Sequence, residues 1–340
     1  MGNGNYRSSC NGHPGSGGRF WAAGVNDIWA VDQHDKWKRF GLALHTGIEP
    51  FSGKILWMKV WHSNQNPQLI LTYYLEAVKK LGFVPLVTQS DPGTENFGIA
   101  NAHTVLRQWH DEALAGTLQH RWMRLRKNIM PEIAWSQLRR RFTPGFESIL
   151  ERGIALDWFD PDNSLHIAVF RWLFIPWLQA ELDAYCDRIN HTAKHRDRKK
   201  VLPHGIPELI FTSPEDFGAL DFKASLVTID PAALDHIQEL YVNPSHPVFD
   251  LVPEPISIVL DDIYAMLGRP AITRMSIWDV YLDLLHQIQD SPSRSTPLQL
   301  SLDDDALPLL DNQADLPFRE DADGYYYMGG VGRGLGMRMY

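Results

Sequence analysis

The chain has 340 residues, of which 44% are hydrophobic and 21% charged, a composition typical of a globular protein with one large domain or two ordinary ones. Its two cysteines exclude a disulfide framework and a cysteine-rich zinc site. The net charge of −9 argues against a polyanionic partner for the chain as a whole, but residues 281–325 carry −8 of it while residues 121–200 carry +5.

Residues 1–24 are rich in Gly, Asn and Ser, and we expect them to be disordered. They show no apolar secretory signal, and the low cysteine content fits a reducing compartment. We therefore expect an intracellular protein, nuclear or cytoplasmic, that is not secreted. The most apolar stretch, residues 165–180, is interrupted by Arg171 and Pro176, which predicts a buried helix and no membrane partner.

The first predicted elements are three β-strands joined by short links. Apolar, β-branched and aromatic residues gather in three segments, which are residues 27–32, 40–45 and 54–61. Links this short favour an antiparallel meander. The first strand ends in an acid, Asp32.

After the meander, the apolar residues change to a helical period. A helix is predicted after Pro67, with Gly82 as its C-terminal stop. Residues 83–88 then have the composition of a buried strand, and this strand leads to a second acid, Asp91.

The next elements alternate between helix and strand. Thr94 or Asn96 is the predicted cap of a helix that runs to about His110. A short strand within residues 119–125 and a helix over residues 131–142 follow. The order of these elements, with acids at the ends of the first and fourth strands, predicts an α/β fold with a mixed sheet. A further long helix is predicted from about Asn163 to Asn190.

Three acids are candidates for a metal-dependent site. Asp32 and Asp91 stand at strand ends, where α/β folds place their sites, and Glu132 stands in the first turn of a helix. Carboxylate oxygens are ligands for Mg²⁺ or Mn²⁺, and two such ions can activate an attacking oxygen and stabilise a leaving oxygen on phosphorus. Spacing alone does not single out these three acids among 41. Each also has a structural interpretation, as a strand-end, turn or helix-start acid.

Four longer motifs occur in this part of the chain, and three of them contain the candidate acids. They are Trp29–Gly41, Phe51–Ile55 with its Ser-x-Lys-Ile turn, Thr88–Asn96 with Asp followed by Gly and Glu-Asn, and Asn128–Trp135 with the pattern Asn-x-x-x-Glu-x-x-Trp. Together they resemble the integrase core domains of eukaryotic transposon-derived proteins. The separations of 59 and 41 residues are close to those of the D,D,E polynucleotidyl transferases.

The resemblance implies a ribonuclease-H-like fold, which is a mixed five-stranded sheet flanked by helices, followed here by a mainly helical C-terminal extension. It implies that Asp32 bridges two Mg²⁺ or Mn²⁺ ions and that Asp91 and Glu132 bind one each. It also implies an integrase or transposase reaction, with hydrolysis at a transposon DNA end and attack of a 3′-hydroxyl on target DNA. Three neighbours are expected to support the metal ligands, namely Asp35, Glu95 and Asn96.

Basic residues near Glu132 predict contacts with DNA phosphates. At 100° per residue, Trp135, Leu138 and Phe142 share one side of the helix, and Arg139 lies beside them. The expected nucleic-acid-binding residues are Lys127, Asn128, Arg139, Arg140, Arg196 and Lys199. Such contacts position DNA without reading its sequence. Transposon-end and target DNA are the expected partners; RNA and a second copy of the chain are partners that the resemblance leaves open.

On this basis the chain divides into five segments. They are a disordered N-terminal segment (1–24), an integrase-like catalytic core (25–148), a helical extension of the core (149–212), a mixed, mainly helical region (213–290) and an acidic, Gly-rich disordered tail (291–340). No Cys/His zinc module precedes the first strand, so we expect a DNA-end-recognition domain to be missing. Two alternative functions stay open: a catalytically inactive DNA-binding or scaffold protein, and a ribonuclease-H-like nuclease that differs only in its substrate.

Overall fold

The computed structural model describes residue 22 and residues 24–123, 128–194, 202–218, 220–221, 228–290, 318–321 and 324–327. The strands are β1 (Gly24–Val25), β2 (Ile28–His34), β3 (Ala43–Glu49), β4 (Lys54–Trp61), β5 (Val87–Ser90), β6 (His120–Trp122), β7 (Leu220–Asp221), β8 (Phe318–Asp321) and β9 (Gly324–Tyr327). The α-helices are α1 (Pro67–Leu81), α2 (Phe97–His110), α3 (Ile129–Arg141), α4 (Thr143–Ala155), α5 (Ser164–Asn190), α6 (Pro207–Thr212), α7 (Pro231–Tyr241), α8 (Glu254–Met266) and α9 (Ile277–Gln289).

A five-stranded mixed sheet forms the centre of the molecule, with the strand order β4-β3-β2-β5-β6. Strands β2, β3 and β4 are antiparallel neighbours, so the predicted meander is confirmed. Strands β5 and β6 run parallel to β2. Because β2 and β5 pair in parallel, the residues that follow both strands emerge at the same edge of the sheet.

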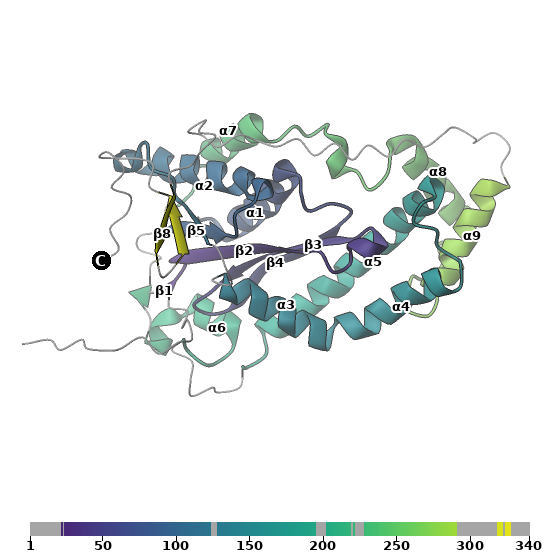
Figure 1. The fold of residues 1–340 in the computed structure, drawn as a ribbon, viewed down its shortest axis with the longest axis horizontal. Coiled ribbons are helices and arrows are strands. Elements are labelled where there is room, and N and C mark those ends of the chain that lie inside the picture. Colours follow the sequence, from purple (N-terminus) through teal and green to yellow (C-terminus); the bar gives the residue numbers. More distant parts are fainter. Residues whose placement is uncertain are drawn as a thin grey trace, which may run out of the picture.

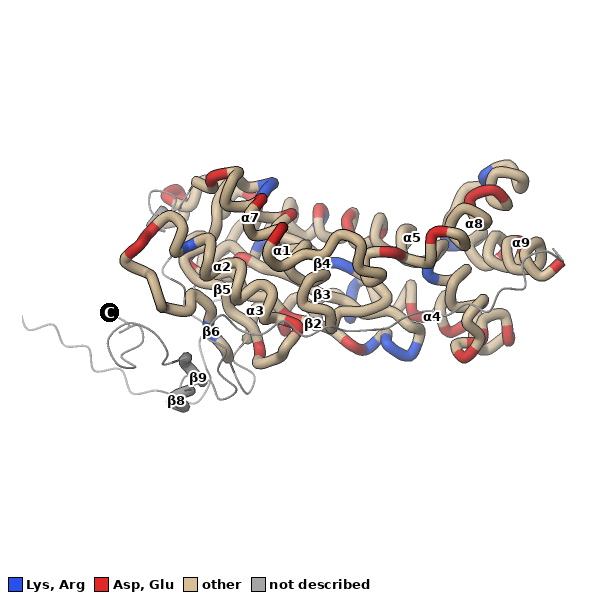
Figure 2. The backbone as a smooth tube through the Cα atoms, turned by 90° about the horizontal axis from the view of Figure 1, so that it is seen from above, with Lys and Arg blue, Asp and Glu red and all other residues tan. Residues whose placement is uncertain are grey.

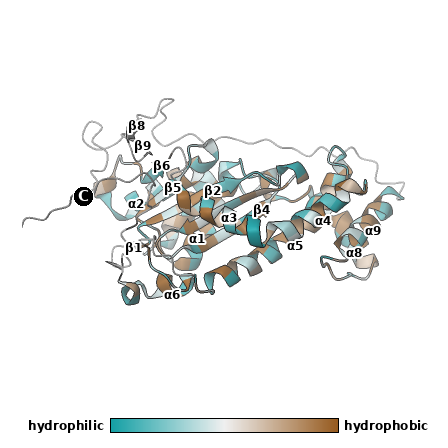
Figure 3. Cartoon of the chain, turned by 60° about the horizontal axis from the view of Figure 1, so that its bottom comes forward, coloured by the Kyte–Doolittle hydropathy of each residue, from teal (hydrophilic) through white to brown (hydrophobic). Residues whose placement is uncertain are grey.

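Helices cover both faces of the sheet (Figure 1). Helices α1 and α2 lie over one face with α7 beside α2, while α3 and α5 lie over the other. Alternate residues of each strand point to opposite faces, which gives two hydrophobic cores. Trp29, Val31 and Trp57 pack with α1 and α2, whereas Leu44 and Met58 pack with α3 and α5. In Figure 3 the α5 helix alternates between hydrophobic and hydrophilic turns.

The first long helix ends where the sequence predicts. The Asn66 side chain caps α1 by accepting hydrogen bonds from the amides of Gln68 and Leu69. Pro67 occupies the first helical position, where its missing N–H costs nothing. Gly82 ends the helix in the left-handed region at φ 80°, and its N–H donates to the Val78 carbonyl.

The second strand differs from the prediction of residues 40–45. Residues Lys38–Phe40 form a 3₁₀ turn that buries Phe40, and Gly41 closes the turn at φ 72°. Strand β3 therefore begins at Ala43 and continues to Glu49. Phe40, which was included in the predicted strand, is therefore buried in the core from a turn.

Two further local predictions hold only in part. The fourth strand begins at Val87 rather than Phe83, because Pro85 has no N–H to donate to a neighbouring strand. Asn96 does occupy the N-cap position of α2, but its side chain makes no capping hydrogen bond, since residues Thr94–Asn96 form a 3₁₀ turn that runs directly into the helix.

Helix α5 confirms the predicted long helix and covers the exposed edge of β4. The Asn190 side chain accepts a hydrogen bond from the Ile55 amide at 2.9 Å and donates one to the Ile55 carbonyl at 2.8 Å. Gln179 likewise accepts from the Val60 amide and donates to the Met58 carbonyl, both at 3.0 Å. Within the described part of the chain, no helix is long and apolar enough to cross a bilayer.

The C-terminal helices belong to the same core as α5. Tyr281 and Leu284 of α9 are buried with Phe174 of α5, and Trp278 Nε1 donates to the Ile149 carbonyl of α4 at 2.8 Å. In the tail, β8 and β9 pair as an antiparallel hairpin beside β6. The rest of the 291–340 segment, and nearly all of residues 1–24, lie outside the described residues.

Candidate active site

Two of the three predicted acids meet at one edge of the sheet. Asp32 is the fifth of the seven residues of β2, so the strand does not end at Asp32 as predicted but continues to His34, and Asp91 directly follows β5. The parallel register, with Ala30 opposite Gln89, brings the two acids to the same strand ends. Both line a cleft of about 510 Å³, whose other walls are Gln33, His34, Asp35, Lys36, Pro92, Glu95 and Asn96.

The Asp32 carboxylate is held by the helix that carries the third acid. Trp135 of α3 donates from Nε1 to Asp32 Oδ2 at 2.9 Å. The indole also stacks on His34, with ring centroids 4.8 Å apart and planes at 16°. One buried tryptophan therefore fixes α3 against the end of β2.

Burial, together with repulsion between neighbouring carboxylates, raises the pKa of both aspartates. Burial, followed by repulsion from Asp91, raises the pKa of Asp32 to about 7, while the Trp135 hydrogen bond opposes this rise. Burial and repulsion from Glu132 raise the pKa of Asp91 to about 6. A cation bound between these carboxylates would relieve the repulsion and lower both pKa values.

Glu132 lies near the cleft without lining it. It stands in the first turn of α3 with an exposed side chain, and its charge acts on both Asp32 and Asp91. Among the described residues, no three His, Cys, Asp or Glu side chains are grouped so that they could hold a metal ion. The carboxylate oxygens of Asp32, Asp91 and Glu132 are nevertheless of the kind that binds divalent cations. Of the three side chains, those of Asp32 and Asp91 also share one cleft.

The three residues expected to support the metal ligands, Asp35, Glu95 and Asn96, all line the cleft. Asp35 accepts a hydrogen bond from Asn64 Nδ2 and forms an ion pair with Lys38, both at 2.9 Å. Asn96 Nδ2 donates to Glu95 Oε1 at 3.0 Å and to the Asp91 carbonyl at 3.4 Å. Burial raises the pKa of Glu95. Asn96 therefore ties together the turn that carries Asp91.

The predicted DNA-binding residues have different positions. Arg139 and Arg140 are exposed near the end of α3, and Arg140 Nε donates to the Ser136 carbonyl of its own helix. Asn128 is buried: its Nδ2 donates to the Val31 carbonyl at 2.7 Å, and its Oδ1 accepts from Gln89 Nε2 at 3.2 Å. It therefore joins β2 and β5 instead of facing solvent, because both ends of its amide are used internally. Lys127, Arg196 and Lys199 lie outside the described residues.

The family model of the integrase core domain matches residues 20–210. The chain belongs to the integrase core domain family. The motif resemblance and the ribonuclease-H-like fold are thereby confirmed. No curated protein matches the chain. Family membership supports a polynucleotidyl-transferase-type role and nucleic acid as a partner, and integrase core domains usually use divalent metals.

Four residues that line the cleft of this integrase core domain were not singled out from the sequence, namely Gln33, His34, Lys36 and Pro92. His34 stacks on Trp135 and lines the cleft two residues after Asp32. Burial lowers the pKa of His34 to about 4, and the charges of Lys36 and, more weakly, Arg139 add to the lowering. Its place could have been predicted, because residues i and i+2 of a strand share a face.

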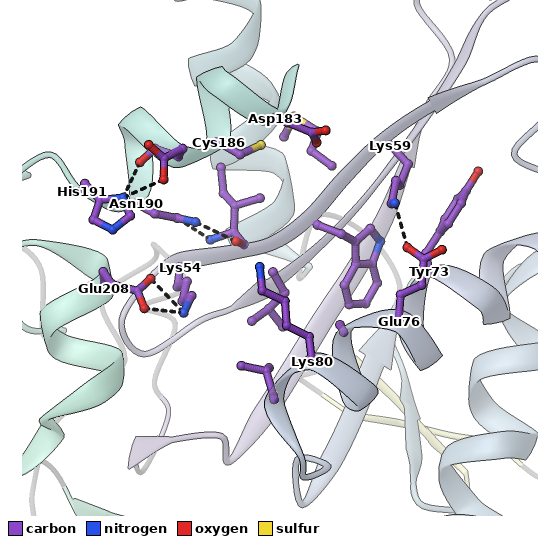
Figure 4. A pocket seen from close by; sticks show the side chains of 17 residues that line it. Lys54, Lys59, Tyr73, Glu76, Lys80, Asp183, Cys186, Asn190, His191 and Glu208 are labelled. Carbon is purple, nitrogen blue, oxygen red and sulfur yellow. Dashed lines mark hydrogen bonds and ion pairs between the residues drawn. The ribbon is translucent and has the colours of Figure 1, made fainter. Parts of the chain in front are cut away.

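A second cavity of about 510 Å³ lies over the edge strand β4, between α1 and α5 (Figure 4). Its charged side chains are largely paired with one another. Lys54 contacts Glu208 at 2.8 Å, and Lys59 contacts Glu76 at 2.8 Å. No motif acid lines this groove. In the other cleft, the carboxylates of Asp32 and Asp91 form no ion pair within the described part of the chain, so that cleft is the candidate active site.

Proposed function

We propose that this integrase core domain catalyses metal-dependent phosphoryl transfer on DNA, with Asp32, Asp91 and Glu132 as its catalytic acids. The parallel pairing of β2 and β5 supports this function, because it places Asp32 and Asp91 in one cleft where their charges repel. The proposed reactions are cleavage at a transposon end and strand transfer. In each reaction a water or 3′-hydroxyl oxygen forms a new bond to phosphorus, the bond to the leaving oxygen breaks, and the attacking group's proton is lost to solvent.

Asp32 and Asp91 would hold Mg²⁺ or Mn²⁺ with Glu132, and two such ions would supply activation of the attacking oxygen and stabilisation of the leaving one. Trp135 keeps Asp32 Oδ2 in place through its hydrogen bond. The exposed Glu132 side chain makes no hydrogen bond or ion pair among the described residues, which leaves it free to turn towards the cleft. Arg139 and Arg140, exposed on the same helix, would contact DNA phosphates.

A nicking and strand-transfer assay with labelled DNA and Mn²⁺ tests this function. Because each acid contributes several kcal/mol of transition-state stabilisation through the cations, Asp32→Asn, Asp91→Asn and Glu132→Gln should each lower the rate at least ~100-fold. The matched control is Glu76→Gln, which neutralises an exposed acid in the β4 groove and should leave the rate unchanged. Unchanged activity in Asp32→Asn or Asp91→Asn would refute the assigned site.

A second candidate function is a transposon-derived DNA-binding or scaffold protein without catalysis. The exposed position of Glu132, outside the wall of the cleft, favours it. On this alternative the purified protein binds DNA, releases no product with Mn²⁺, and keeps its DNA affinity in Asp32→Asn.

An RNA–DNA hybrid in the same assay tests the ribonuclease-H-like alternative, which predicts cleavage of the RNA strand in preference to DNA.

A further inference from the structure

A buried histidine of β6 lies beside the end of β5, the strand that leads to Asp91. The two strands pair in parallel, with Thr88 opposite His120 and Ser90 opposite Trp122. Residues directly opposite each other share a face of the sheet, and so do residues i and i+2 of one strand. The side chains of Thr88, Ser90 and His120 therefore lie on one face, and all three residues are buried.

Both ring nitrogens of His120 have a hydroxyl partner on β5. The Thr88 Oγ1 lies 2.8 Å from Nδ1, and the Ser90 Oγ lies 3.0 Å from Nε2. The Ser90 hydroxyl also donates to the carbonyl oxygen of Asp91 at 2.8 Å. A carbonyl oxygen can only accept, so the single hydroxyl proton of Ser90 is used in this bond.

The direction of every hydrogen bond in this group follows from that proton. Because the Ser90 Oγ has no second proton, Nε2 of His120 must donate to it. Burial lowers the pKa of His120 to about 3, and the charge of Arg121 adds to the lowering, so the ring is neutral at physiological pH. A neutral imidazole has one N–H, and Nδ1 therefore accepts from Thr88. The donors run in one order, from Thr88 to His120, to Ser90 and to the Asp91 carbonyl.

The carbonyl of Asp91 is held from two sides. Ser90 donates to it from the strand at 2.8 Å, and Asn96 Nδ2 donates to it from the following 3₁₀ turn at 3.4 Å. These bonds fix the peptide group between Asp91 and Pro92, and with it the direction in which the Asp91 side chain leaves the backbone. The imidazole of His120 is in turn packed edge-on against Trp122, with ring centroids 4.3 Å apart and planes at 61°.

We propose that His120 is a positioning residue of the active site, which orients the Ser90 hydroxyl and thereby holds the backbone of Asp91 at the end of β5. Neither His120 nor Ser90 lines the cleft, so both act through Asp91. This role rests on the proposed function, since it concerns the placement of a catalytic acid.

Four substitutions separate positioning from the general cost of losing a buried hydrogen bond. Ser90→Ala removes the bond to the Asp91 carbonyl, and His120→Asn loses the donor at Nε2 while keeping a polar atom near Nδ1. His120→Gln keeps a donor near the place of Nε2. The matched control is Thr88→Val, which removes the bond on the other side of the same ring and leaves Ser90 and Asp91 untouched.

The measurement is hydrogen exchange of the Asn96 and Phe97 amides in the full chain, without DNA or metal. These amides donate to the carbonyls of Gly93 and Thr94, so their exchange reports opening of the turn that follows Asp91. Loss of one buried hydrogen bond should make them exchange about tenfold faster in Ser90→Ala and in His120→Asn than in Thr88→Val. His120→Gln should stay within about twofold of the unsubstituted protein.

The double variant of His120→Asn with Ser90→Ala tests whether the histidine acts through the serine. The two amides should exchange no more than about twofold faster in it than in Ser90→Ala, because both changes remove the same link. Multiplied effects in the double variant, equal exchange in Ser90→Ala and Thr88→Val, or equal exchange in His120→Gln and His120→Asn would each overturn the proposal.

If the His120 variants do not fold, the comparison of Ser90→Ala with Thr88→Val decides by itself, because both replace a small buried hydroxyl residue. Faster exchange in Ser90→Ala supports the role, and equal exchange refutes it. Because the exchange needs neither metal nor catalysis, its result is distinguishable from failure of the nicking assay.

Discussion

At the scale of single residues, the Asp32 carboxyl links active-site charge to stability. Its pKa rises from 3.8 to about 7 on folding, mainly through burial. Between these two values the folded chain binds more protons than the unfolded chain, so stability falls as the pH rises through this window and then levels off. The ionised, buried Asp32 carboxylate therefore lowers the stability of the folded chain at neutral and alkaline pH.

Removing the charge of Asp32 should therefore stabilise the protein only where the carboxyl is ionised. We expect Asp32→Asn to match the unsubstituted chain at pH 4 and to exceed it by about 2 kcal/mol at pH 8, after allowance for solvent screening. Urea unfolding at the two pH values measures the difference. The same gain in stability at both pH values would show that the ionisation of Asp32 is not the cause of the gain.

At the scale of elements, the side of β4 away from β3 is closed by side chains rather than by another strand. Gln179 and Asn190 lie eleven residues apart on α5, three helical turns, so both face the sheet. Their amide groups bond the backbone of Ile55, Met58 and Val60. An unpaired edge would be a template for pairing between chains, and these amides cover part of it.

Loss of one of these side-chain amides should lower the stability of the protein and expose the outer edge of β4. Asn190→Ala leaves the buried Ile55 amide and carbonyl without partners, at a cost of about 2 kcal/mol, and should increase self-association. Chemical unfolding and light scattering measure the two effects. Asp187→Ala on the same helix removes only an exposed pair with His191 and should change stability by less than about 0.5 kcal/mol. An Asn190→Ala variant as stable as Asp187→Ala would contradict this role.

At the scale of the whole molecule, the hydrophobic core extends beyond the family match. The match ends at residue 210, yet Trp278, Tyr281 and Leu284 of α9 are buried with α5 and α4. Because these side chains are buried, the C-terminal helices contribute to folding through apolar packing.

In the view of Figure 2, basic positions are scattered among acidic ones along the helices.

Two glycines in α4 test this packing. A Cβ at Gly153 would lie 2.0 Å from the Trp278 indole, whereas at Gly145 the nearest atom would be 3.6 Å away. Gly153→Ala should therefore cost about 2 kcal/mol by displacing α9 from α4. Gly145→Ala should be neutral or stabilise by up to about 1 kcal/mol, because alanine favours the helix. Thermal unfolding of the two variants compares them, and equal stability would contradict a close α4–α9 contact.

Several features could be predicted from the sequence because their causes are local. Pro67 and Gly82 delimit α1, apolar residues at helical spacing give α5, and positions just beyond the paired part of two parallel strands bring Asp32 and Asp91 together. The start of β3 was not predictable, because the Phe40 side chain is buried from a turn closed by Gly41. That burial depends on distant residues of the core.

The sequence by itself determined the family, the mixed sheet and the placing of Asp32 in the first strand of the meander and of Asp91 after a buried strand, since motif order and local periodicity carry that information. Only the tertiary structure decided how the polar side chains are used. It buries Asn128 between β2 and β5, leaves Glu132 exposed and joins His45 to Trp57 by a hydrogen bond. The physical reason is that a hydrogen bond between residues far apart in the chain depends on how the strands and helices pack, and a local pattern does not record that packing.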